Sequence, residues 1–264
     1  MPRVVRLVAA DWVHERLGRV DVLLLDPRLP MRYLQGHLPG AVSVPLPKAF
    51  DPGGGLLPPE ALAAWLGAAG LSDAATPVVY DGYDGQRGAM LAWLLEYLGR
   101  ADVCLLDVYY DAWRADGRPV QYRAATAPPA SFTVRLNAAI RADADAVERG
   151  ADVLLDVRSP EEYAGDAEGD PRPGHIPGAR HLDWRALAGA SREGSYLAPR
   201  EQLQAALAER GIGPGEAVIA YCRAGPRAAL AYLALQQLGQ PVRLLDGSYA
   251  AWAAAGRPIE TGAG

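Results

Sequence analysis

Short apolar runs alternate with stretches of helical periodicity along this chain. In its first half, the apolar runs Val22–Asp26, Val78–Tyr80 and Val103–Asp107 end in turn-forming or polar residues, which is typical of strands. Residues Pro59–Ala69 and Gly88–Leu98 carry apolar side chains at helical spacing between these runs. Strands without polar alternation are buried on both faces. The order therefore predicts an α/β fold, with a mainly parallel sheet and helices on both of its faces.

The second half of the chain repeats this pattern. A strand-like run at Glu216–Tyr221 stands between helical patterns at Pro199–Arg210 and Arg227–Leu238. Several motifs also return in the same order, namely Val22–Arg28 as Val153–Arg158, Gly36–Ala41 as Gly174–Ala179, Val78–Asp81 as Val218–Cys222, Leu105–Asp107 as Leu244–Asp246 and Ala112–Trp113 as Ala251–Trp252. So long a period indicates a duplicated domain rather than a solenoid.

The boundary between the two copies lies in a stretch rich in alanine, proline and small polar residues. This stretch has no apolar periodicity and contains the stiff pair Pro128–Pro129. We therefore predict a first domain at residues 1–122, a linker at 123–131 and a second domain at 132–264.

The amino-acid composition and the distribution of charge exclude some classes of function. The 264 residues are 50% hydrophobic and 22% charged with a net charge of -5, and the arginines are scattered among acids without a basic stripe, so we expect no nucleic-acid partner. No apolar run is long enough to cross a membrane, and the N-terminus has no apolar core of a signal peptide. The two cysteines have no framework spacing, which fits a reducing compartment. We expect a soluble, cytoplasmic protein.

Cys222 is the most informative residue for function. It stands in a short loop between the predicted strand that ends at Tyr221 and the predicted helix from Arg227. The end of a strand followed by a helix N-terminus favours negative charge, and the nearby cations Arg223 and Arg227 also favour a thiolate. Such a thiolate suits a nucleophile that attacks a small anion. The alternative is a buried structural cysteine, the usual role of a lone Cys.

The loop length separates two chemistries that use a cysteine among anion-binding groups. In a phosphatase loop the arginine lies one residue further from the cysteine than Arg227 does here, so that it can hold phosphate oxygens bidentately. The ring from Cys222 to Arg227 is too small for a phosphate and suits a smaller target, such as the outer sulfur of thiosulfate or a persulfide on the cysteine.

Four motifs together resemble the tandem-domain rhodanese family of thiosulfate sulfurtransferases. They are the strand end Asp156–Arg158, the element Gly174–Ala179, the loop Tyr221–Gly225 and the ending Leu244–Trp252. The resemblance covers nearly the whole chain in two copies, and it implies two α/β rhodanese-like domains of which only the C-terminal one is active. It also implies that Cys222 takes the sulfane sulfur of thiosulfate, releases sulfite, and passes the persulfide sulfur to cyanide or a thiol acceptor.

The choice of donor depends on the loop. The expected substrate-binding residues are Arg223, Ala224, Gly225 and Arg227. Their two cations suit the thiosulfate dianion, whereas mercaptopyruvate enzymes of this family resemble Cys-Gly-Ser-Gly here and tend to have Arg where this chain has Glu162. Some thiosulfate enzymes have Lys at the position of Ala224, and Pro226 has no N–H, so the anion cradle has fewer donors. A 3-mercaptopyruvate sulfurtransferase and a non-catalytic binding or regulatory module remain the alternatives.

The other notable residues have structural interpretations. Asp81 occupies the position of Cys222 in the first copy and cannot carry sulfur, which makes that half inactive. His37 and His175 recur in both copies and are expected to bond to backbone, and Trp113 and Trp252 are expected to anchor the final helix of each copy. Arg158 is expected to form an ion pair at its strand end, and Cys104 to be buried and inert. We expect no cofactor and no metal, and the oligomeric state stays open, with a monomer as one option.

Overall fold

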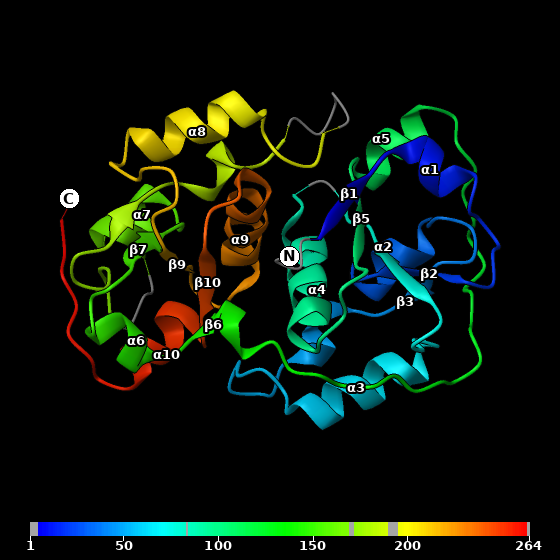
Figure 1. Cartoon of the computed structure of the whole chain (residues 1–264), viewed down its shortest axis with the longest axis horizontal. Coiled ribbons are helices and arrows are strands. Elements are labelled where there is room, and N and C mark those ends of the chain that lie inside the picture. The colour runs from blue at the N-terminus through cyan, green and yellow to red at the C-terminus, as the bar shows by residue number, and fades with distance from the viewer. Residues whose placement is uncertain (1–4, 83, 169–171, 190–194, 263–264) are drawn as a thin grey trace. The chain divides into compact units, whose positions relative to one another are not determined.

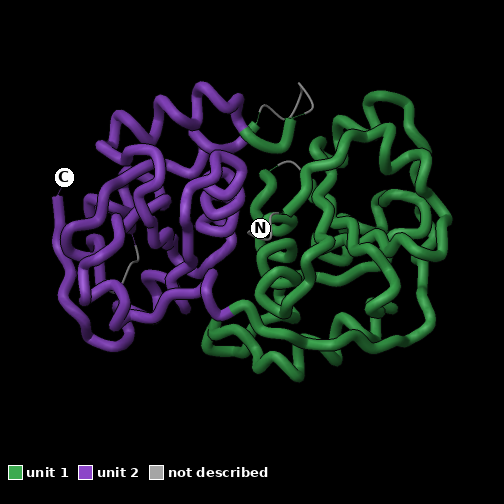
Figure 2. The backbone as a smooth tube through the Cα atoms, in the orientation of Figure 1, with its two compact units in different colours: residues 1–137, 189–197 green, residues 138–188, 198–264 purple. Residues whose placement is uncertain are grey.

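The computed structural model describes residues 5–82, 84–168, 172–189 and 195–262, and its contacts divide the chain into two compact units (Figure 2). Unit 1 comprises residues 1–137 and 189–197, and unit 2 comprises residues 138–188 and 198–264. In this division the predicted linker 123–131 falls within unit 1, and so does a short stretch from the second half of the chain. The domain boundaries inferred from the sequence stay a prediction.

Unit 1 is built on a five-stranded sheet in the order β1-β5-β4-β2-β3, with every neighbouring pair parallel. Helices of the same unit flank this sheet (Figure 1). The elements follow along the chain as β1 (Arg6–Val8), α1 (Ala10–His14), β2 (Val22–Asp26), α2 (Pro30–Leu34), β3 (Val42–Ser43), η1 (Leu46–Ala49), α3 (Pro59–Ala68), β4 (Thr76–Val79), α4 (Gln86–Tyr97), β5 (Cys104–Leu106) and α5 (Tyr110–Ala115).

Unit 2 repeats this architecture with the strand order β6-β10-β9-β7-β8, again all parallel. Its elements are η2 (Ala138–Ile140), β6 (Arg141–Ala142), α6 (Ala144–Glu148), β7 (Val153–Asp156), α7 (Pro160–Ala164), β8 (Arg180–His181), η3 (Trp184–Ala186), α8 (Arg200–Ala208), β9 (Val218–Tyr221), α9 (Pro226–Leu238), β10 (Val242–Leu245) and α10 (Ser248–Ala254). Two parallel-sheet α/β units confirm the predicted fold class.

The two longest helices, α4 and α9, are buried along nearly their whole length. Both are rich in alanine and leucine on every side, and a helix that is apolar all round belongs in a core. Each packs against two central strands of its own sheet, α4 against β4 and β5, and α9 against β9 and β10. Each helix therefore begins beside the carboxyl ends of these strands.

Several predicted boundaries differ from the structure by one or two residues, and two of these differences have a clear local reason. The helix expected from Gly88 begins at Gln86, because Gly85 adopts a φ of +69° that lets the chain turn into the helix two residues earlier. The strand expected from Glu216 begins at Val218, because the Glu216 carboxylate accepts the Gly213 N–H at 2.6 Å in the preceding turn.

No helix in the described ranges is both long enough and apolar enough to cross a membrane.

Candidate active site

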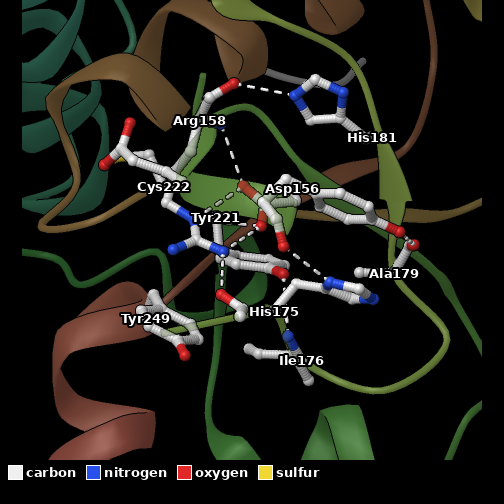
Figure 3. Close-up of polar contacts among 12 residues, drawn as sticks. Asp156, Arg158, His175, Ile176, Ala179, His181, Tyr221, Cys222 and Tyr249 are labelled. Carbon is white, nitrogen blue, oxygen red and sulfur yellow. Dashed lines mark hydrogen bonds and ion pairs between the residues drawn. The ribbon is translucent and has the colours of Figure 1, made fainter. Parts of the chain in front are cut away.

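Cys222 lies at the carboxyl end of β9, directly before the loop that leads into α9 (Figure 3). β9 pairs with β10 on one side and with β7 on the other, so the residues that follow these three strands meet at one edge of the sheet. The Cys222 side chain is 1% exposed, and its Sγ accepts the Gly225 N–H at 3.1 Å. Gly225 has a φ of +114°, which glycine adopts readily, and it directly precedes α9. The Cys222 Sγ therefore lies beside the positive end of that helix, which attracts negative charge.

The segment after β10 holds the Cys222 loop in position. The Cys222 N–H donates to Ser248 Oγ at 3.4 Å, and the Tyr249 N–H donates to the Cys222 carbonyl at 2.9 Å. Ser248 is buried and has a φ of +52°, the one positive φ of a non-glycine residue in the described part of the chain. Ser248 was not among the residues predicted from the sequence. It follows Asp246–Gly247 after β10 and reaches Cys222 because β10 pairs with β9.

Arg158 forms the predicted ion pair at the end of β7. Its Nε and Nη2 bond the Asp156 carboxylate at 2.6–3.0 Å, and Nη2 also donates to the Gly174 carbonyl at 2.7 Å (Figure 3). The guanidinium lies 4.0 Å from the ring centre of Tyr249, and the whole residue is buried. Burial opposes the charged guanidinium, but the Asp156 ion pair raises the pKa of Arg158 above its ordinary value. The pair fixes the loop after β7 and confirms the structural interpretation.

Arg227 is held by Glu162, a partnership that the sequence did not indicate. Its Nη1 and Nη2 donate to the two Glu162 carboxylate oxygens at 2.5 and 2.8 Å, and both side chains are mostly buried. Glu162 also accepts the Ser159 N–H, while Ser159 Oγ accepts the Glu162 N–H, which makes a capping box at the start of α7. Burial opposes the Glu162 carboxylate, but the bonds from Arg227 and Ser159 lower its pKa to about 2. Glu162 is therefore an anion that neutralises the cation expected to bind the donor.

The remaining loop residues lie nearer to the surface. Arg223 and Ala224 are exposed, and Gly225 is half-buried. Pro226 is the first residue of α9, where the missing N–H removes no helical hydrogen bond. The loop thus brings together the thiol, one backbone donor to its sulfur and the exposed Arg223.

The equivalent place in unit 1 holds Asp81 instead of a thiol. The alignment of the two copies is visible in their hydrogen bonds, because Tyr110 N–H donates to the Asp81 carbonyl as Tyr249 N–H does to that of Cys222. The Asp81 carboxylate is buried and accepts the Gly82 N–H at 2.6 Å and the Gly88 N–H at 2.7 Å. Burial and nearby Asp84 raise the pKa of Asp81 to about 6, although those two backbone bonds oppose the rise.

The residues interpreted as structural are found in such roles. His37 and His175 are buried, and the Nδ1 of each lies 2.9 or 2.8 Å from a backbone carbonyl of the preceding helix. The Nε1 groups of Trp113 and Trp252 donate to the carbonyls of Pro119 and Pro258 respectively. Cys104 is buried, and burial raises its pKa. Among the residues described, no three His, Cys, Asp or Glu side chains are grouped so that they could hold a metal ion.

The chain is similar to known proteins in sequence and in fold. The rhodanese-like domain family matches residues 9–116 and 142–255. A protein of Synechococcus elongatus, provisionally named thiosulfate sulfurtransferase, is 35% identical over 275 residues, covering 98% of this chain and 86% of the relative. A thiosulfate sulfurtransferase of Corynebacterium glutamicum is 34% identical over 284 residues, covering 97% and 91%. The solved structure of wild-type EanB superimposes with a TM-score of 0.85 at 23% identity, covering 98% of this chain and 70% of that one, a likeness of fold.

Proposed function

The chain belongs to the rhodanese-like family, and from this premise we propose that it is a thiosulfate sulfurtransferase whose second domain carries sulfur on Cys222. The observation that carries the proposal is the Cys222 Sγ at the start of α9, with a backbone N–H directed at it. The names of the relatives support sulfur transfer in general, and the persulfide and the acceptors are our proposal.

In the first half-reaction, the Cys222 thiolate attacks the outer sulfur of thiosulfate. A new S–S bond forms to Cys222, the S–S bond of thiosulfate breaks, and sulfite leaves with the electron pair. The helix N-terminus and the Gly225 N–H then stabilise the negative charge on the enzyme persulfide. No proton transfer is needed, because nucleophile and leaving group are both anions.

In the second half-reaction, cyanide or a thiolate attacks the outer sulfur of the persulfide. The product is thiocyanate or a new persulfide, and the Cys222 thiolate leaves with the electron pair and is ready for another donor. This step needs an exposed outer sulfur, whereas Sγ itself is buried. The outer sulfur extends beyond Sγ, which makes it the accessible atom for an acceptor.

Thiosulfate is our proposed donor over 3-mercaptopyruvate. Arg223 and Arg227 stand on either side of the loop, and their charges favour a dianion. Glu162 cancels the charge of Arg227 and leaves Arg223 as the more exposed cation of the loop. Mercaptopyruvate enzymes tend to have an arginine where this chain has Glu162, so the carboxylate of that donor would lack this cationic partner here.

The test compares two cysteine variants and two donors. Sulfite release from thiosulfate should be lost in Cys222→Ser, because a serine hydroxyl does not ionise and attack sulfur, and should be retained in the matched control Cys104→Ser. Pyruvate release from 3-mercaptopyruvate, measured at the same pH with the same acceptor, should be the less efficient reaction.

Three outcomes would change the proposal. Sulfur transfer by Cys222→Ser would remove its nucleophile. A higher catalytic efficiency with mercaptopyruvate would replace the donor. Absence of transfer from either donor, in a protein whose Cys222 still reacts with iodoacetamide, would favour the non-catalytic binding module.

A further inference from the structure

Unit 1 contains a cavity where unit 2 has its candidate active site. The cavity has a volume of about 460 Å³ and lies beyond the carboxyl ends of β2, β4 and β5. Its wall includes Arg28 after β2, Asp81 and Asp84 after β4, and the α5 residues Tyr110 and Arg114. This volume is in the range of small-molecule sites, and the edge is the one at which parallel sheets bind ligands. In this cavity Asp81 stands at the position that Cys222 has in unit 2.

Several charges of this cavity are already neutralised inside unit 1. Arg28 is paired with Asp26 beneath it at 2.6 Å, and Arg87 lies 3.8 Å from Asp84. The Asp81 carboxylate accepts the Gly82 and Gly88 N–H groups. These backbone donors are therefore not available to bind an external anion. An external ligand must therefore be bound by side chains.

The charges that stay available at this wall are mainly positive. Arg32 on α2 and Arg114 on α5 are exposed and form no ion pair within the described ranges, and Asp111 is the remaining unpaired acid there. Arg32 and Arg114 come from two elements on opposite sides of Asp81 in the sequence. Among the exposed charged side chains of this wall, two are arginines and one is an acid, which favours an anionic ligand at the outer part of the cavity, away from the buried Asp81 carboxylate.

The wall of this cavity also contains a buried guanidinium group. Arg28 lines the cavity and is only 6% exposed, and its Nε and Nη2 are used by Asp26 and Gly36. Its Nη1 has no hydrogen-bond partner in the described chain and, unlike Nη1 of Arg158, is not completely buried. A guanidinium held this firmly offers its last N–H groups at little entropic cost.

We infer that unit 1 binds an organic carboxylate of metabolite size, held by Arg28 at the bottom of the cavity and by Arg32 and Arg114 at its mouth. Guanidinium forks match carboxylate geometry, which explains three arginines from three elements. The volume exceeds what an inorganic oxyanion fills, and Leu29 and the Tyr110 ring supply apolar surface for a carbon skeleton. This inference goes beyond sulfur transfer, since none of these residues belongs to the Cys222 loop.

Calorimetric titration of the full chain with citrate and with glutarate tests the inference, with sulfate as the inorganic comparison. We expect at least one of the two carboxylates to bind with a Kd of about 1 mM or tighter, and sulfate to bind much more weakly. Arg32→Ala and Arg114→Ala should each weaken carboxylate binding roughly tenfold, as expected for loss of a charged hydrogen bond. Both residues are exposed, so an unchanged unfolding temperature should show that the fold is intact.

Two control variants locate the binding. Arg123→Ala removes an exposed arginine of unit 1 outside the cavity, and Arg223→Ala removes the cation beside Cys222; both should leave carboxylate affinity unchanged. Loss of binding in Arg223→Ala but not in Arg114→Ala would place the ligand at the Cys222 loop and overturn the inference. Equal affinity for sulfate would overturn the ligand class, and no binding of citrate or glutarate would overturn the site. Because no sulfur transfer is measured, these results are independent of the proposed reaction.

Discussion

At the scale of single residues, the Glu162–Arg227 pair controls how much positive charge the candidate nucleophile has beside it. Glu162→Gln removes the negative charge and keeps a side-chain oxygen for the Ser159 N–H. It should leave Arg227 charged but uncompensated, and we expect the KM for thiosulfate to fall several-fold. Arg227→Ala should lower kcat/KM roughly 10- to 100-fold, with partial recovery in Arg227→Lys. Steady-state kinetics with thiosulfate and cyanide measure both effects.

The control for this prediction is the neighbouring exposed acid Glu161. Glu161→Gln changes the net charge by the same amount on the same helix, without touching Arg227, and should leave the KM unchanged. If Glu161→Gln and Glu162→Gln acted alike, the effect would come from overall charge and not from the pair.

Asp81 should make the stability of the chain depend on pH. Its pKa rises from an ordinary 3.8 to about 6 on folding, so the folded chain binds this proton more tightly than the unfolded chain. The contribution of Asp81 is therefore fully present below about pH 4 and is lost as the pH rises through 6. Asp81→Asn cannot lose a proton, and its stability relative to the wild type should increase by about 2 kcal/mol between pH 4 and pH 7.

Urea unfolding at pH 4, 5, 6 and 7 measures this difference, and the comparison across pH is unaffected by the one backbone hydrogen bond that the amide cannot accept. The exposed Asp111→Asn of the same cavity is the matched control and should show a smaller change with pH. A constant difference between Asp81→Asn and wild type over this pH range would show that Asp81 is ionised normally.

At the scale of secondary-structure elements, α7 is a short helix that depends on its cap. Ser159 Oγ accepts the Glu162 N–H, and removing such a cap typically costs about 1 kcal/mol. We expect Ser159→Ala to lower the free energy of unfolding by about that amount and to loosen the Glu162–Arg227 pair, which should lower the KM for thiosulfate in the same direction as Glu162→Gln. Ser159→Thr keeps the hydroxyl and should restore both values. If Ser159→Thr were affected as strongly as Ser159→Ala, the hydrogen bond of the hydroxyl would not be the cause of either effect.

The elements themselves were largely predictable, because local patterns determine them. The strand Val22–Asp26 has the predicted bounds, and α9 ends at the predicted Leu238, since apolar runs and a terminal glycine are local signals. The thiol loop was predictable for the same reason, as Cys222 stands directly between a strand and a helix. The Arg227–Glu162 pair joins residues far apart in sequence, and Ser248 reaches Cys222 only through sheet pairing, so neither contact has a local signal.

At the scale of the whole molecule, the duplication is visible in the sequence, but the sequence does not show which residues make up each compact unit. Residues 189–197 follow the second copy's Gly174–Ala179 motif, yet their contacts belong to unit 1. Tyr196 is fully buried there, its hydroxyl donates to the Gly85 carbonyl at 2.5 Å, and Tyr109 donates to the Tyr196 carbonyl at 2.8 Å. No periodicity in the sequence marks Tyr196 as a residue of unit 1, because its hydrogen bonds join residues that lie far apart in the chain.

Tyr196 should therefore support the fold of unit 1 although it lies in the second half of the sequence. Tyr196→Ala removes a buried aromatic ring and leaves the Gly85 carbonyl without its donor, and we expect a loss of about 3–5 kcal/mol in the stability of unit 1. Hydrogen exchange of the full chain should show faster amide exchange in α4 and β5, while β9 and α9 keep their protection. Tyr122→Ala, which removes a tyrosine that is 62% exposed, should change neither region. Faster exchange in α9 with unchanged α4 would mean that this stretch stabilises unit 2 instead.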